Sequence, residues 1–235
     1  MPTSLITFSA GQETLSGRLS LSRNQAKPTV LFLHGAGISN KDRYYPLSHH
    51  LLEKGVSSFA FDFSGQGEST GHLQKSSLEK RVQEAETALQ FFDLSQPLTV
   101  VGASMSGHIA LELLGRHPEI ETIILFCPAL YALEAFRPAF DSGFSDIIRM
   151  PNSWRKSAVL EHLREFTGNF LVAIGEEDTV IPEGVIELLV ENSEKAKKRE
   201  LVRLPGITHQ LLPAINADPA LLSMVSEKML EFLPH

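Results

Sequence analysis

One serine stands where an apolar run meets a helical pattern. The segment Val100-Val-Gly-Ala-Ser-Met-Ser-Gly107 places Ser104 between Gly102 and Ser106-Gly107. A nucleophile on a strand-to-helix turn needs small neighbours, because the backbone passes close to it on both sides. Such a turn raises the hydroxyl above the sheet edge and points the N–H of Met105 toward the same space. Ser104 is therefore a candidate nucleophile, and a buried serine that caps the helix is the alternative interpretation.

This segment resembles the nucleophile elbow of the α/β-hydrolase superfamily, usually written Gly-x-Ser-x-Gly, with Ser106 in place of the second glycine. His34-Gly-Ala-Gly37 follows an apolar run and is similar to the oxyanion loop of that family. Acyl transfer creates an alkoxide that two backbone N–H groups must stabilise. The resemblance implies that these are the N–H groups of Ala36 and Met105, and that His34 shapes the loop.

The resemblance also supplies the partners of the serine. Ile174–Pro182 is similar to the acid loop of the family and implies Asp178 as the acid, while Leu204–Gln210 presents His209 after the last strand pattern. The chain order of serine, aspartate and histidine is that of this fold. The resemblance thus implies a catalytic triad of Ser104, Asp178 and His209.

Other residues remain alternatives for these roles. Glu176 and Glu177 adjoin the proposed acid, so an assignment wrong by one or two positions is the main alternative there. Asp62-Phe-Ser-Gly-Gln-Gly-Glu-Ser69 resembles the Asp-x-x-Gly-x-Gly-x-Ser turn of the family, with Gln66 where histidine is common, and is assigned no chemistry. The remaining rival acids and histidines are Asp62, Asp141, Asp146, His49, His50, His108 and His117.

The elements that must position these residues alternate along the chain. Residues 4–22 predict a hairpin around Gly11, and strands are expected at 29–33, 56–63, 98–101, 122–126, 170–174 and 201–204. Helices are expected at 44–54, 77–93, 106–115, 182–191 and 217–232. This pattern predicts a mostly parallel sheet with helices on both faces, and the resemblance implies the eight-stranded α/β-hydrolase fold as one domain over residues 1–235. Residues 131–166 form an aromatic-rich insertion, expected to be a short lid over the carboxyl ends of the strands.

Composition limits the partners of the protein. The 235 residues carry 21 Lys and Arg against 28 Asp and Glu, a net charge of −7, so nucleic acid is an unexpected partner. Neither a metal-binding motif nor a nucleotide-binding loop is present, so no metal or cofactor is expected. The single cysteine, Cys127, fits a reducing compartment. With no signal-peptide pattern and no apolar run long enough to span a membrane, the expected location is the cytoplasm. The oligomeric state is not predicted.

The resemblance and the triad that it implies predict a serine hydrolase that cleaves a small to medium carboxylic ester through an acyl-enzyme. The phenylalanines of 131–166 are compatible with an apolar acyl pocket or with the core of the lid. A thioesterase, acyltransferase, peptidase or C–C hydrolase with the same triad is the first alternative. A non-catalytic scaffold that binds a ligand is the second alternative, and such scaffolds usually lack a member of the triad.

Overall fold

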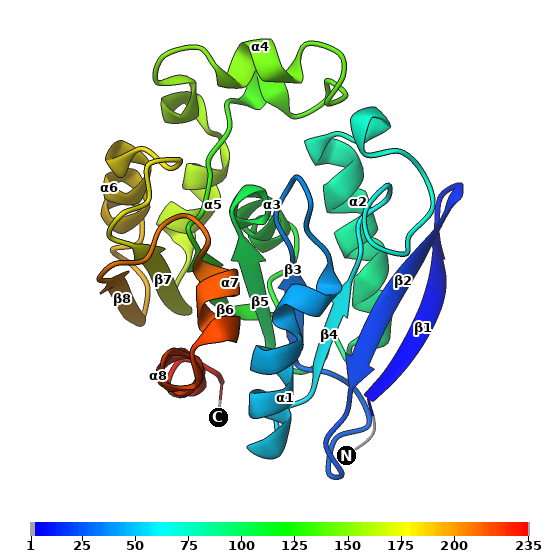
Figure 1. Cartoon of the computed structure of the whole chain (residues 1–235). Helices are drawn as coiled ribbons and strands as arrows, with labels where there is room; N and C mark the ends of the chain where they lie inside the picture. Colours follow the sequence, from blue (N-terminus) through cyan, green and yellow to red (C-terminus); the bar gives the residue numbers. More distant parts are fainter. Residues whose placement is uncertain (1–2, 235) are drawn as a thin grey trace.

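The computed structural model describes residues 3–234, which form one eight-stranded sheet flanked by helices (Figure 1). The strand order is β1-β2-β4-β3-β5-β6-β7-β8. β2 pairs antiparallel with β1 and β4, and all neighbours from β4 to β8 are parallel. The predicted mostly parallel sheet is confirmed. The strands are β1 (Thr3–Ala10), β2 (Glu13–Ser20), β3 (Val30–Leu33), β4 (Ser58–Phe61), β5 (Leu98–Ala103), β6 (Ile120–Phe126), β7 (Asn169–Gly175) and β8 (Lys198–Leu204).

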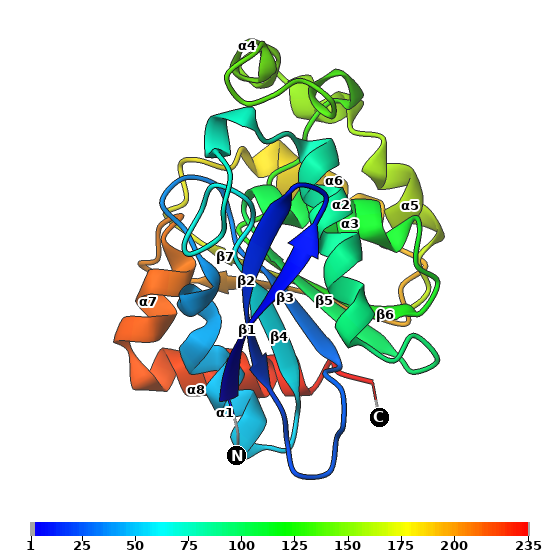
Figure 2. The same cartoon turned by 90° about the vertical axis from the view of Figure 1, so that its right-hand side faces the viewer.

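Helices cover both faces of the sheet, as predicted. Every residue of the central strands β3, β4 and β5 is buried, which explains why these segments are apolar without alternation. α1 and α8 lie on one face, and α2, α3 and α5 lie on the other (Figure 2). The longer helices are α1 (Tyr45–Glu53), α2 (Leu78–Ala88), α3 (Met105–Leu114), α5 (Val159–Glu165), α6 (Glu183–Glu191), α7 (Leu211–Ala217) and α8 (Pro219–Leu230).

The C-terminal part of the chain differs from the prediction. The helix expected over 217–232 begins at Pro219, where the Asp218 side chain accepts hydrogen bonds from the N–H groups of Ala220 and Leu221. α7 has no counterpart among the expected helices, and its Pro213 would disfavour a helix at an interior position. Proline is tolerated in the first turn of a helix, where its missing N–H has no partner to lose, and Pro213 is the third residue of α7.

Residues 127–168, between β6 and β7, form an insertion that rises above the carboxyl ends of the strands and carries α4 (Phe144–Ile148) at its top (Figures 1 and 2). Its last helix, α5, returns to the sheet and packs on α3. The aromatic rings of the insertion are buried in the core or pack against it; they are Tyr131, Phe136, Phe140, Phe144, Trp154 and Phe166. Among the described residues, no helix has the length and apolar character that crossing a membrane requires.

Candidate active site

Ser104 occupies a strained turn between β5 and α3. Its φ and ψ are 51° and −118°, a conformation that L-residues with a side chain rarely adopt. A Cβ on Gly102 would clash with the carbonyl oxygen of Ser106, so only glycine fits beneath the turn. The Ser104 N–H donates to the Phe126 carbonyl at 2.9 Å, which fastens the turn to the end of β6. The local backbone thus holds the hydroxyl above the sheet edge.

Three distant residues meet at this edge. Nε2 of His209 lies 3.1 Å from Oγ of Ser104, and its Nδ1 lies 2.8 Å from Oδ2 of Asp178. Asp178 comes from the loop after β7, and His209 comes from the loop between β8 and α7. Because the carboxyl ends of parallel strands share one edge, residues that are 74 and 31 positions apart in sequence form one hydrogen-bonded row.

The Asp178 carboxylate is held on both oxygens. Oδ1 accepts from the N–H groups of Val180 at 2.8 Å and Ile181 at 3.1 Å, while Oδ2 faces His209. Burial alone would raise the pKa of the Asp178 carboxyl, but these hydrogen bonds outweigh it and the pKa is lowered. Asp178 therefore stays ionised and can hold the proton of the imidazole on Nδ1.

Two backbone N–H groups near the serine have no acceptor among the described residues. Among residues 3–234, neither the N–H of Ala36 nor that of Met105 donates to a protein acceptor. Gly35 contributes to this approach, because a Cβ there would stand 3.2 Å from Cβ of Ser104. The structure therefore leaves both predicted donors available beside the Ser104 hydroxyl.

His34 is buried and shapes this loop from within. Its Nδ1 lies 2.9 Å from the Gly35 carbonyl, and its Nε2 accepts from the Phe63 N–H at 3.2 Å. These partners place the proton on Nδ1. Burial, together with the charge of Arg81, lowers the pKa of His34 to about 3, so the ring is neutral. His34 thus has contacts that organise the loop and none to Ser104 Oγ or Asp178 among the described hydrogen bonds.

Ser106, the departure from the usual elbow, has a contact that the sequence did not predict. Its Oγ donates to the His34 carbonyl at 2.6 Å, so α3 is tied to the start of the oxyanion loop. Gln66, the departure in the glycine turn, also reaches this loop. Its Nε2 donates to the carbonyls of Gly37 at 2.7 Å and Ser39 at 3.3 Å. The only sequence signal for either contact was an unusual residue within a familiar motif.

The rival residues lie outside this row. Asp62, in the glycine turn, pairs with Lys41 at 2.7 Å, and Asp141 pairs with Lys75 at 2.7 Å. Glu176 and Glu177 are exposed, whereas the side chain of Asp178 is 5% exposed. Other histidines have different neighbours: His49 is near Glu53, His108 is buried in α3, and His117 faces Glu119. His50 lies half-buried on α1, and Asp146 lies exposed on α4.

Cys127 lies behind the row, at the end of β6. Cys127, Asp178 and His209 each bring one possible metal-ligand atom within 4.8 Å of the others. However, burial raises the pKa of the Cys127 thiol to about 12, and a metal ligand must be a thiolate. The His209 nitrogen on this side is already engaged by Asp178. The arrangement is therefore a hydrogen-bonded row of three side chains with a buried thiol beside it.

A cavity of about 410 Å³ opens beside Ser104. Most of its wall is apolar or backbone, and Arg43 brings a charged side chain to it. A larger hollow of about 1110 Å³ is lined by residues at the opposite edge of the sheet and includes none of the three hydrogen-bonded residues. The smaller cavity is lined by Gly35, Ala36, Gly37, Ile38, Ser39, Arg43, Ala103, Ser104, Phe126, Cys127, His209, Gln210, Leu211, Leu212 and Pro213.

Comparisons with known proteins agree with this architecture. A CIB-like hydrolase from Thermoplasma acidophilum has 14% identity and a TM-score of 0.73 over 99% of this chain and 100% of that chain. Est1E from Butyrivibrio proteoclasticus, solved with ferulic acid bound, has 20% identity and a TM-score of 0.70 over 97% and 98%. The Pyrococcus furiosus esterase Pf2001 has 19% identity and a TM-score of 0.71 over 98% and 93%. At these identities the likeness establishes the fold.

No curated protein matches the chain. The family described as serine aminopeptidase, S33, matches residues 24–149, which include the oxyanion loop, the glycine turn and the elbow. This match extends over more than half of the chain. The chain therefore belongs to the serine aminopeptidase S33 family of hydrolases, within the α/β-hydrolase superfamily that its motifs resemble.

Proposed function

We propose that this protein is a serine hydrolase that cleaves a small to medium carboxylic ester through an acyl-enzyme intermediate. The observation that carries the proposal is the hydrogen-bonded row of Ser104, His209 and Asp178 on a strained elbow. A buried serine that merely caps a helix would need neither the strained backbone nor a histidine backed by an ionised carboxylate. Membership in a hydrolase family supports the same reading.

In the first half of the proposed reaction, Oγ of Ser104 attacks the ester carbonyl carbon. His209 Nε2 takes the hydroxyl proton, and Asp178 stabilises the imidazolium through Nδ1–H. The N–H groups of Ala36 and Met105 donate to the oxyanion. Collapse of the tetrahedral intermediate breaks the ester C–O bond, and His209 returns the proton to the leaving alcohol.

In the second half, water replaces the alcohol. His209 takes a proton from water as its oxygen attacks the acyl carbon of the Ser104 ester. The same two N–H groups stabilise the second oxyanion. Its collapse releases the carboxylic acid and returns the proton to Ser104, so no cofactor or metal enters any step.

Cavity size and lining support the choice of substrate class. About 410 Å³ lies within the range of small-molecule sites, and the apolar wall of Phe126, Leu211 and Leu212 suits an acyl or aryl group.

The net charge of −7 disfavours a nucleic-acid substrate. Within this proposal, residues 131–166 act as a short lid on one α/β-hydrolase domain. The buried single cysteine supports a reducing, cytoplasmic location.

The experiment that tests the proposal is hydrolysis of 4-nitrophenyl esters of increasing acyl length by wild type and by Ser104→Ala. Turnover by wild type and its loss in the folded variant are expected, and the preferred acyl length then reports the size of the cavity. The family description favours one second candidate, an aminopeptidase, so 4-nitroanilides of single amino acids belong in the same series. Equal turnover by wild type and Ser104→Ala would reject the triad.

A further inference from the structure

Gln66 lies between two groups with opposite hydrogen-bonding needs. On one side, backbone carbonyls of the oxyanion loop face its amide: Gly37 at 2.7 Å, Ser39 at 3.3 Å and Gly35 at 3.5 Å from Nε2. On the other side, the guanidinium of Arg81 donates to its Oε1. Carbonyls only accept and a guanidinium only donates, so these partners fix which end of the amide faces the loop.

Arg81 is fully buried on α2 and lacks a carboxylate within 4 Å among residues 3–234. Its guanidinium carbon lies 4.6 Å from the ring centre of Phe63 and 5.3 Å from that of Phe140, so two aromatic faces enclose it. Its Nε and one terminal nitrogen have no hydrogen-bond partner in the described chain. Burial lowers the pKa of Arg81 to about 10, and the group still carries its charge at neutral pH.

A buried cation with only one hydrogen-bonded partner is costly to keep. An apolar side chain of similar size would fill the space between Phe63 and Phe140 without that cost. The two aromatic faces and the nearby Glu84 carboxylate offset part of this cost, and the hydrogen bond to Gln66 is a contact that an apolar side chain could not make. The one hydrogen bond that it makes leads to the oxyanion loop, where Ala36 lies between two of the residues whose carbonyls Gln66 holds.

We propose that Gln66 and Arg81 are positioning residues for the oxyanion hole: Arg81 orients the Gln66 amide, and Gln66 holds the Gly35–Ser39 backbone so that the Ala36 N–H faces Ser104. The inference rests on the proposed function. Phe140 belongs to the insertion, so its ring against Arg81 also places the insertion in contact with this chain of residues. A misplaced oxyanion donor weakens the transition state more than the bound ester.

The test uses substitutions that separate position from packing. Gln66→Glu keeps the shape and an oxygen for Arg81, but it replaces the N–H donors that face Gly37 and Ser39. We expect kcat for 4-nitrophenyl butyrate to fall about 10- to 100-fold with KM within about twofold. Affinity for a trifluoromethyl ketone, which forms an oxyanion on the serine, should fall by a similar factor. Gln83→Glu, an exposed change on α2, is the matched control and should behave as wild type.

Arg81→Met tests whether Arg81 acts through Gln66. Alone it should lower kcat in the same way, and combined with Gln66→Ala it should lower kcat no further than Gln66→Ala does, because both act through one contact. Thermal melts exclude unfolding as the cause. An unchanged kcat and ketone affinity in folded Gln66→Glu, or fully additive losses in the double variant, would overturn the inference. Wild type without Ser104-dependent ester turnover would instead reject the proposed function.

Discussion

The loops that carry Ser104, Asp178 and His209 and the insertion of residues 127–168 border the same edge of the sheet, yet they are held differently. The loops are short, and each follows a strand of the central parallel sheet. The insertion is long, contains only short helices, and is anchored by aromatic rings. Leu133 and Met150 on it are 62% and 58% exposed. We propose that the strand ends carry the chemistry and that the insertion selects the substrate.

The largest effect is expected from substitutions in the loops that carry Asp178 and His209. Replacing His209 with alanine should lower kcat for a 4-nitrophenyl ester by about 10⁴-fold or more, because Ser104 loses its base. Asp178→Asn should cost about 10⁴-fold, because an asparagine amide favours the wrong tautomer of His209. Steady-state kinetics on protein with an unchanged melting temperature measures both. A loss below tenfold in either variant would show that the row is not the catalytic relay.

How far the sequence predicts this edge depends on how local each signal is. The small residues around Ser104 and the buried runs of β3, β4 and β5 are local, and they predict the elbow and the sheet. The contacts of Gln66 and Ser106 depend on segments far apart in sequence, which no periodicity reveals. α7 is not predicted, and its Pro213 does not distinguish a helix start from a break. The arrangement of the insertion was equally hidden, since aromatic residues suit a pocket and a core alike.

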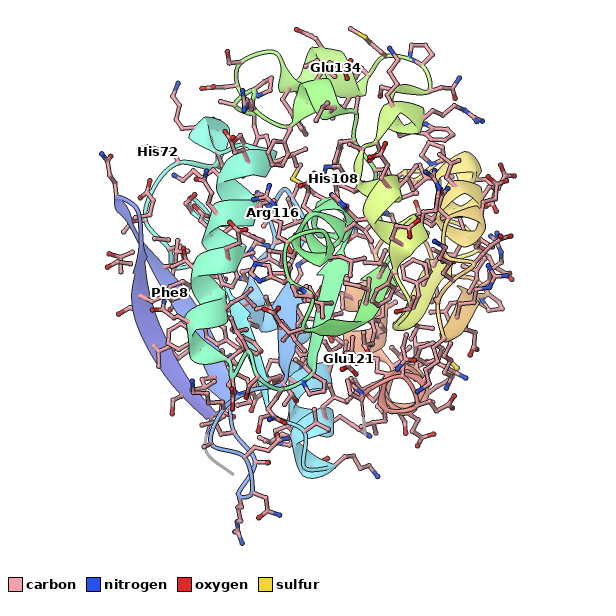
Figure 3. All side chains as sticks on the ribbon, turned by 180° about the vertical axis from the view of Figure 1, so that it is seen from behind. Phe8, His72, His108, Arg116, Glu121 and Glu134 are labelled. Atoms are coloured by element: carbon pink, nitrogen blue, oxygen red, sulfur yellow. The ribbon has the colours of Figure 1, made fainter. Side chains whose placement is uncertain are left out.

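A second test addresses how the insertion docks on α3. His108 is buried on α3, below the insertion, and Glu134 lies near the top of the insertion (Figure 3). Its Nδ1 lies 3.4 Å from Tyr131 N and 3.5 Å from Ser157 Oγ. Nε2 lies 3.9 Å from a carboxylate oxygen of Glu112, and the His162 imidazole is a further titratable neighbour. Burial, aided by His162, lowers the pKa of His108 to about 3, so the docked ring is neutral.

The lowered pKa of His108 determines how the free energy of unfolding depends on pH. The unfolded chain binds a proton at His108 near pH 6.5, and the folded chain does so only near pH 3. The stabilising contribution is therefore complete above pH 6.5 and is lost as pH falls toward 3. Between pH 7 and 5 the loss is about 2 kcal/mol for this residue. Urea unfolding of His108→Gln at both pH values should show a drop smaller than that of wild type by about this amount, and an identical drop would contradict it.

A smaller effect is expected where α3 is tied to the oxyanion loop. Ser106→Ala removes the 2.6 Å hydrogen bond to the His34 carbonyl and leaves that buried acceptor without this donor. We expect a loss of about 1–2 kcal/mol in the free energy of unfolding and a decrease of a few fold in kcat. Chemical denaturation with parallel kinetics measures both. Ser95→Ala, in an exposed turn, is the control, and equal behaviour of the two variants would remove the role given to Ser106.

The smallest effect is expected from substitutions in the insertion. Leu133→Ser and Met150→Ser alter exposed apolar side chains of the insertion that do not line the cavity beside Ser104. If the insertion selects the acyl group, KM should rise a few fold for the longest accepted ester, while kcat/KM for 4-nitrophenyl acetate stays within twofold of wild type. A uniform loss on every ester would place the insertion in the chemistry and remove the division between the two regions.

Covalent labelling of Ser104 is the most direct test of the proposed catalytic triad. A fluorophosphonate requires an activated nucleophile and an oxyanion hole, so it reports the proposed arrangement without any assumption about the substrate. We expect one adduct per folded wild-type chain, found by peptide mapping on Ser104, with none on Ser104→Ala and strongly slowed labelling of His209→Ala. Folded wild type that stays unlabelled, or an adduct on another residue, would contradict it.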